Sequence, residues 1–189
     1  VFSADPSTAG FGDEVADGEG EPPPVFDSML FADPPDHGRL RGVVSEFFTP
    51  RAISEQADRI QELTEGYVDE LDDEFDLVSE LAYPMPVDVI AELLGVPTAD
   101  RTRFKRWSDT LIERPQTTEA GMETYQRRQQ ETQREMSQYF SELIETRRAE
   151  PRDDLISAII EADVDGQRLT DRELIGFCTL LLVAGNITT

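Results

Sequence analysis

Two side chains near the start of the helical part of the sequence have the types and spacing of an anion clamp. His37 and Arg41 are four residues apart, so they project from the same face of a helix. An imidazole N–H beside a guanidinium fork can bind a carboxylate or a phosphate. The competing interpretation is an ordinary surface pair that bonds nearby acids, which are abundant in this chain. The spacing therefore indicates a possible anion site on this helix.

A second group lies at the opposite end of the sequence, where small residues are followed by hydroxyls. Thr188 comes four residues after Ala184 and three after Gly185, so in a helix its hydroxyl lies beside the gap that they leave. A flat ligand or a small molecule could approach the backbone in that gap. The alternative is that Ala184 and Gly185 allow close helix packing while Thr188 bonds back to a carbonyl.

Acidic residues and one cysteine supply two further candidates. The run Asp72-Asp73-Glu74-Phe75-Asp76 has the pattern with which some enzymes hold magnesium and diphosphate, and hard cations favour carboxylates. In so acidic a chain such a match arises readily by chance, and no second metal motif accompanies it. Cys178 lies inside an apolar run, which indicates an inert core thiol.

The elements that must position these groups are expected to be helices. Residues 1–25 combine glycines, acids and a run of prolines, which predicts an irregular acidic loop, and residues 26–189 carry a helical pattern. The sequence therefore predicts a mainly α protein with one helical domain after the loop. The expected helices cover about 36–48, a segment from Thr49-Pro50, 87–94, a segment capped by Thr98, 119–150, a segment from Asp153 or Asp154, and a last helix opened by Thr170.

Composition limits the function. The chain has 17 basic and 40 acidic residues and a net charge of −23, which disfavours binding to nucleic acid or to an anionic membrane. Lys105 is the only lysine, and acids occur in every segment, a pattern typical of a salt-adapted surface. No apolar run approaches the roughly 20 residues of a membrane span. We therefore expect a soluble, cytoplasmic protein.

Several segments together resemble the soluble bacterial cytochromes P450. The segment 31–41, which contains His37 and Arg41, is similar to the helix C region, and 180–186 with Thr188 is similar to the oxygen-binding part of helix I. The resemblance covers about 26–189 in family order. It identifies the chain as an internal fragment, from the B–C loop to helix I, without the N-terminal β region and the C-terminal haem-ligand region. The matching segments are 31–41, 47–51, 82–97, 153–157 with the 165–166 turn, and 180–189.

The resemblance implies a role for each candidate residue. His37 and Arg41 correspond to the pair that binds the propionates of haem b. Ala184 and Gly185 correspond to the groove in which dioxygen binds, and Thr188 to the threonine that helps to deliver protons there.

The resemblance also implies a contact with substrate at Met29 and Leu30, which lie in the loop before helix C. The family would also supply a function: a haem-thiolate monooxygenase that inserts one atom of dioxygen into a small apolar substrate. Electrons would come from NAD(P)H through a ferredoxin or a flavoprotein. The alternatives are a magnesium-dependent, diphosphate-handling helical enzyme that uses Asp72–Asp76, and a non-catalytic helical interaction protein.

Two departures from the family pattern matter. Ile187 stands where the family usually has an acid directly before the threonine, which puts proton relay through a carboxylate in doubt. The family's iron ligand is a downstream cysteine, preceded by a Glu-x-x-R helix, and neither is found among these residues. We therefore expect no metal ligand in this chain and no activity from the chain alone.

Overall fold

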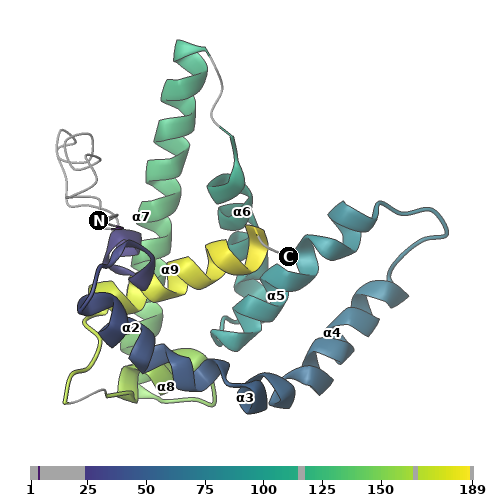
Figure 1. Ribbon diagram of the computed structural model, residues 1–189. Helices are drawn as coiled ribbons and strands as arrows, with labels where there is room; N and C mark the ends of the chain where they lie inside the picture. Colours follow the sequence, from purple (N-terminus) through teal and green to yellow (C-terminus); the bar gives the residue numbers. More distant parts are fainter. Residues whose placement is uncertain (1–3, 5–23, 115–117, 164–165, 188–189) are drawn as a thin grey trace.

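The computed structural model describes residue 4 and residues 24–114, 118–163 and 166–187, and in these ranges the chain is helical without a β-strand (Figure 1). This confirms the predicted fold class. The predicted loop 1–25 lies almost wholly outside the described residues. The elements are η1 (Pro24–Asp27), η2 (Met29–Phe31), α2 (Asp36–Ser45), η3 (Glu46–Phe48), α3 (Pro50–Glu55), α4 (Ala57–Asp69), η4 (Val78–Ala82), α5 (Pro84–Leu93), η5 (Thr98–Asp100), α6 (Arg101–Ile112), α7 (Glu119–Ala149), α8 (Leu155–Glu161) and α9 (Asp171–Ile187).

Helix α9 is the central element, as its apolar sequence predicts. It crosses the middle of the molecule and packs against η1, α5, α6, α7 and α8 (Figure 1). Its middle is buried, and Cys178 has no exposed surface. The segment η1 lies close to α9 at Gly176, where a Cβ would be 2.4 Å from the carbonyl oxygen of Pro24. A larger residue at Gly176 would therefore displace η1.

An aromatic cluster joins α6 to α7. The rings of Phe104 and Phe140 meet edge to face, with centroids 5.8 Å apart and an interplanar angle of 85°. Trp107 lies in the same cluster without exposed surface, and its indole N–H donates to Glu135 Oε2 at 2.9 Å. The cluster therefore buries large apolar area while the polar edge of the indole keeps a partner.

Helix starts follow the predicted capping residues in three cases. The Thr49 hydroxyl accepts a hydrogen bond from the amide three residues later, at 3.3 Å, and the Asp154 carboxylate does the same at 2.9 Å. Thr170 and Glu173 form the predicted capping box, in which Glu173 Oε2 accepts from the Thr170 amide at 2.7 Å. These polar residues therefore fix where α3, α8 and α9 begin.

Other predicted boundaries are wrong. Helix α5 begins at Pro84, three residues before the predicted start. The first N–H groups of a helix have no partner inside it, so prolines in the first turn cost no hydrogen bond. The second predicted helix is split into α3 and α4 at Gln56. Thr98 starts the short η5 instead of capping α6.

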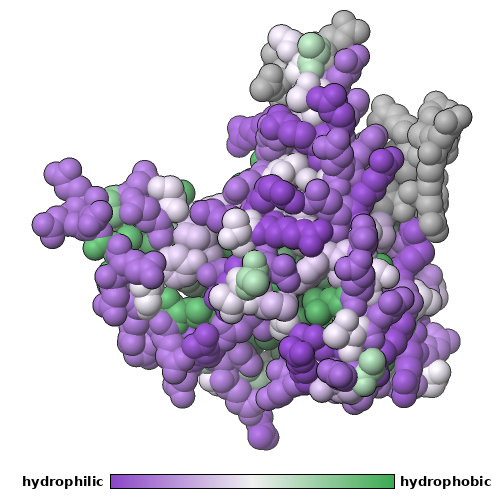
Figure 2. All heavy atoms as spheres, turned by 180° about the vertical axis from the view of Figure 1, so that it is seen from behind, coloured by the Kyte–Doolittle hydropathy of each residue, from purple (hydrophilic) through white to green (hydrophobic). Residues whose placement is uncertain are grey.

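Polar side chains dominate the surface, in agreement with the net charge of −23 (Figure 2). Apolar side chains gather at the tip between α4 and α5, where Phe75, Leu77 and Val78 are 46%, 57% and 66% exposed. No helix in the described part of the chain is both long enough and apolar enough to span a bilayer.

Candidate functional site

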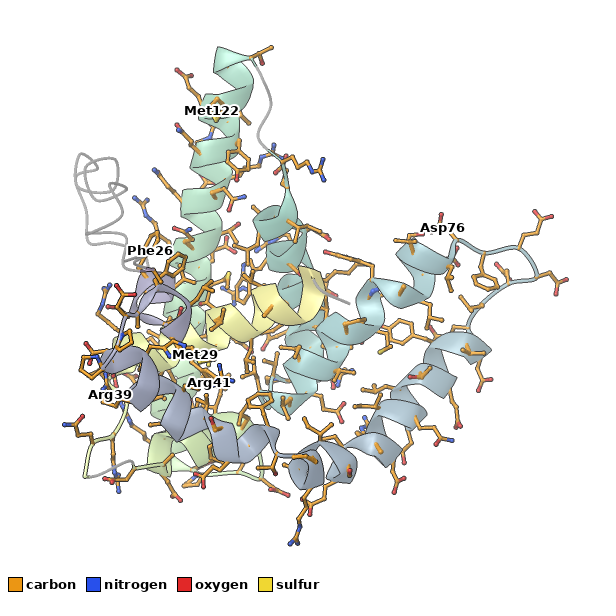
Figure 3. The ribbon with its side chains drawn as sticks, in the orientation of Figure 1. Phe26, Met29, Arg39, Arg41, Asp76 and Met122 are labelled. Atoms are coloured by element: carbon orange, nitrogen blue, oxygen red, sulfur yellow. The ribbon has the colours of Figure 1, made fainter. Side chains whose placement is uncertain are left out.

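Helix α2 presents the two residues of the predicted clamp to solvent. His37 is half-buried in its first turn, and Arg41 is exposed one turn later. Within the described ranges, neither side chain has a hydrogen bond or an ion pair. Arg39, which lies between them, instead binds Glu173 of α9 and leaves the helix on a different side from Arg41 (Figure 3). The structure therefore separates a clamp face of α2 from an anchoring face.

The clamp face fits an anionic group. The surface-pair alternative requires acids beside His37 and Arg41, and no acid among the described residues pairs with either of them. In a chain with 40 acidic residues, this leaves the donors of both side chains available to an external anion. An exposed guanidinium and a neighbouring imidazole can together receive a carboxylate.

The end of α9 gives different environments to the two small residues of the predicted groove. Ala184 is exposed. Gly185 faces α5, where an added Cβ would be 2.6 Å from Ile90 Cγ1, so close packing explains its small size. Thr188 lies outside the described residues, as does Thr189. Ala184 is thus exposed on α9, whereas Ile90 occupies the space beside Gly185.

The two predicted substrate residues lie in η2 and differ in exposure. Met29 is partly buried against the core, whereas Leu30 is 54% exposed. Their neighbour Ser28 is buried, and its hydroxyl donates to the Val25 carbonyl at 2.6 Å. The fold of this loop therefore turns one predicted side chain inward and the other outward.

A small apolar cavity lies between η1, α6, α7 and α9, beside the Ala184 turn. Its volume is about 100 Å³. Sequence reasoning missed it because its walls come from four distant segments, none with a motif of its own. Its walls include Val25, Leu111, Met136, Thr179 and Val183.

A larger polar cleft of about 530 Å³ lies between α4, η4, α5 and α6. Arg101 spans it with contacts to Asp88 at 3.5 Å and to Glu92 at 3.0 Å. The Tyr67 hydroxyl donates to Asp88 at 2.8 Å. The pKa of Tyr67 is raised mainly by burial of the hydroxyl and, to a smaller extent, by this hydrogen bond. These contacts join three helices, so the cleft works as a polar joint. Arg101 Nε is buried there without a hydrogen-bond partner among the described residues.

The acidic run at 72–76 does not form a metal site. Asp76 Oδ1 accepts hydrogen bonds from the amides of Ser79 at 2.8 Å and Val78 at 3.0 Å, and the bonds from Ser79 are the main reason that the pKa of Asp76 is lowered. Among the residues that the structure describes, no three His, Cys, Asp or Glu side chains are placed to hold a metal ion. Burial raises the pKa of Cys178, which keeps this thiol protonated inside α9.

Comparison with known proteins finds extended similarity to one group. The chain is 43% identical over 168 residues to the cytochrome P450 YjiB of Bacillus subtilis, covering 87% of this chain and 42% of that protein. It is 39% identical over 189 residues to the erythromycin C-12 hydroxylase of Saccharopolyspora erythraea, covering 100% of this chain and 45% of that protein. No protein-family model matches the sequence.

The fold gives the same result. The crystal structure of substrate-free CYP109E1 from Bacillus megaterium matches with a TM-score of 0.87 and 34% identity, covering 100% of this chain and 48% of that one. The chain thus spans less than half the length of these relatives. Because sequence and fold agree over the whole of it, the chain belongs to the cytochrome P450 family.

Proposed function

We propose that the chain is part of a haem-thiolate monooxygenase. The protein would insert one atom of dioxygen into an apolar organic substrate, with electrons from NAD(P)H. The relatives support this reading, since PikC of Streptomyces venezuelae, a cytochrome P450 monooxygenase, is 41% identical over 167 residues. The observation that carries the proposal is the pair of donors on α2, His37 and Arg41, which no acid among the described residues neutralises.

In this proposal, haem b supplies the activation of dioxygen, and the chain supplies its surroundings. Arg41 and His37 would hold the two propionates through charge-assisted hydrogen bonds, which would anchor the group to α2. Ala184, exposed on α9, would leave room for a diatomic molecule where a larger side chain would block it. Gly185 would allow α9 to pack closely against Ile90 of α5, and this contact would fix the position of Ala184 relative to α5.

Proton supply is the second task of α9. Thr188 would hold a proton at its hydroxyl, one turn beyond Ala184. Ile187 has no ionisable group, so the proton would have to reach Thr188 through water or through a hydroxyl of the substrate. The enzyme would then depend more on Thr188 than a relative with an acid at the preceding position.

The substrate is proposed to be a bulky apolar molecule. CYP109E1 of Bacillus megaterium has been solved with testosterone, at 36% identity and a TM-score of 0.80. A mutant of EryK has been solved with erythromycin B, at 38% identity and a TM-score of 0.77. The exposed Leu30 and the apolar residues that line the small cavity beside Val183 would form part of the wall of the substrate site. A cytoplasmic ferredoxin or flavoprotein would deliver the electrons.

Haem retention tests the proposal. In the full-length holoprotein, transfer of haem to an excess of an apoglobin would be timed for Arg41→Ala, His37→Ala and Arg51→Ala. Arg51 is the matched control, because it is a 91% exposed arginine on the adjacent α3 that forms a local i,i+4 pair with Glu55. Loss of a charge-assisted bond should speed transfer about tenfold for Arg41→Ala. Equal haem transfer rates for Arg41→Ala and Arg51→Ala would contradict the proposal that Arg41 binds a propionate.

A further inference from the structure

The first turn of α9 is tied to three other elements by ion pairs. Arg148, in the last turn of α7, binds Asp171, with Nη1 and Oδ2 3.1 Å apart. Arg172 reaches back to Asp27 of η1, with Nη2 and Oδ2 2.7 Å apart. Glu173 binds Arg39 of α2. Consecutive residues of one turn therefore contact three different segments.

The Arg39–Glu173 pair is the most shielded of the three. The side chains of Arg39 and Glu173 are 23% and 13% exposed, against 41% and 62% for Arg148 and Asp171. Glu173 Oε1 accepts from Arg39, while Oε2 accepts from the Thr170 amide at 2.7 Å and from its hydroxyl at 3.0 Å. With both oxygens engaged, the carboxylate is fixed in position as well as in charge.

The charge of Glu173 persists despite its burial. Burial by itself raises the pKa of a carboxyl group, but the hydrogen bonds from Arg39 and Thr170 outweigh it, so the pKa of Glu173 is lowered. The pair is therefore ionised at neutral pH. It is also less screened by salt than the exposed Arg148–Asp171 pair.

Arg39 lies between the two clamp residues but faces away from them. Two residues along an α-helix correspond to a rotation of about 200°, so Arg39 cannot share the face of His37 and Arg41. Figure 3 shows Arg39 and Arg41 on different sides of α2. One face of this single turn of helix thus binds α9, and the other presents the clamp.

We infer that Arg39 and Glu173 are positioning residues that set the angle and register of α9 against the clamp helix α2. The inference rests on the proposed function for its second half, since it assigns His37 and Arg41 on α2 to a haem propionate clamp. Ala184 lies 11 residues beyond Glu173, or about 16 Å along the axis. A tilt of about 10° at the first turn would displace Ala184 by about 3 Å, enough to open or close an approach of diatomic size.

The test compares three variants of the full-length holoprotein. Arg39→Met keeps the apolar stem and removes the fork. Glu173→Gln keeps the capping box, which accepts glutamine, and removes the charge. Asp171→Asn is the matched control, since it removes the exposed ion pair of the same turn with α7. Arg39→Lys is the conservative variant, which should recover part of any loss.

The first readout is the rate of thiol modification at Cys178, read by mass spectrometry of its peptide. Cys178 has no exposed surface and lies five residues after Glu173, so it reacts only when α9 moves or the protein unfolds. Global stability would be followed in parallel by helical circular dichroism in urea. Arg39→Met and Glu173→Gln should speed labelling about tenfold beyond what any loss of global stability explains. Asp171→Asn should not.

The second readout is the haem transfer rate of the same variants. Arg39→Met should speed haem loss although Arg39 faces away from the clamp, and Arg39→Lys should give an intermediate rate. If the wild-type protein holds no haem at all, the proposed function fails while the labelling experiment still judges the pair. If Arg39→Met and Glu173→Gln label Cys178 no faster than Asp171→Asn, the positioning role is wrong.

Discussion

Gly95 occupies a position that other residues cannot take without displacing a buried ion pair. Its φ is +72°, and a Cβ would lie 2.1 Å from Asp154 Oδ2. That carboxylate is 2.5 Å from Arg147 Nε, and Arg147 Nη2 donates to the Gly95 carbonyl at 2.6 Å. The side chains of Arg147 and Asp154 are 2% and 5% exposed. Gly95, which lies just after α5, is thus locked to the end of α7 and the start of α8.

Gly95→Ala should destabilise the protein more than Gly166→Ala. Both glycines have positive φ, which costs an alanine about 1–2 kcal/mol, but nothing lies within 4 Å of a Cβ at Gly166. The clash with Asp154 should take the loss for Gly95→Ala above about 2 kcal/mol. Urea unfolding followed by helical circular dichroism measures the difference. Equal losses for the two variants would show that Asp154 moves aside freely.

Thr188→Ala should uncouple electron use from substrate oxidation. Ile187, directly before Thr188, has no carboxylate that could substitute for the Thr188 hydroxyl. Peroxide released per NAD(P)H consumed should therefore rise in the full-length enzyme, while haem content stays constant. Thr189→Ala is the control, because it removes the adjacent hydroxyl. An unchanged ratio in Thr188→Ala would count against any relay role for this threonine.

For single residues, the sequence predicts which side chains could act together on one helix better than it predicts their partners on other helices. The spacing of His37 and Arg41 is enough to place them on one helix face. It does not predict that Arg39, between them, binds a residue 134 positions away. Nor does it show that Ile90 fills the space beside Gly185, because that depends on how α5 crosses α9. Contacts between distant elements depend on packing angles that no single segment specifies.

Helices α4, α5 and α6 are connected by one carboxylate. Glu92 of α5 accepts from Arg59 of α4, Nη2 to Oε2, at 3.0 Å, and from Arg101 of α6 at the same distance. The bond from Arg59 is the main reason that the pKa of Glu92 is lowered. A lowered carboxyl pKa in the folded state stabilises the protein above the unfolded value near 4.5, and this stabilisation disappears as the pH falls through the folded pKa.

Glu92→Gln should therefore lower the urea midpoint at neutral pH, and the deficit should shrink as the pH falls below the unfolded value of 4.5 and through the folded pKa. Comparison with the wild-type protein at each pH cancels the general effect of protonating other acids. Glu55→Gln is the control, because the Arg51–Glu55 pair has side chains that are 91% and 62% exposed. A Glu92→Gln deficit that is independent of pH would contradict ionic coupling of the three helices.

Element boundaries were predictable where a polar side chain satisfies the first turn. Thr49, Asp154 and Thr170 begin helices as predicted, because capping is a local interaction. The break at Gln56 and the early start at Pro84 were not, since tertiary packing decides whether a helical segment bends or extends. The cavity beside Val183 was equally unpredictable, because it exists only where four elements meet.

The whole molecule carries a net charge of −23 with one lysine, so its acids repel one another over the entire surface. Raising KCl from about 0.1 M to about 2 M shortens the screening length from about 10 Å to a few Å, and should raise the urea midpoint. A neutral osmolyte at equal osmolality is the control and should raise it less. A midpoint that falls or stays constant with salt would exclude the salt-adapted interpretation.

The most direct test of the proposed haem site is a crystal structure of the full-length protein with haem bound. We predict that Arg41 and His37 lie within hydrogen-bonding distance of the propionates, that Ala184 faces the iron, and that the Arg39–Glu173 pair is retained. Propionates bound by other residues, with His37 and Arg41 left in solvent, would contradict the assignment of α2 as the clamp helix.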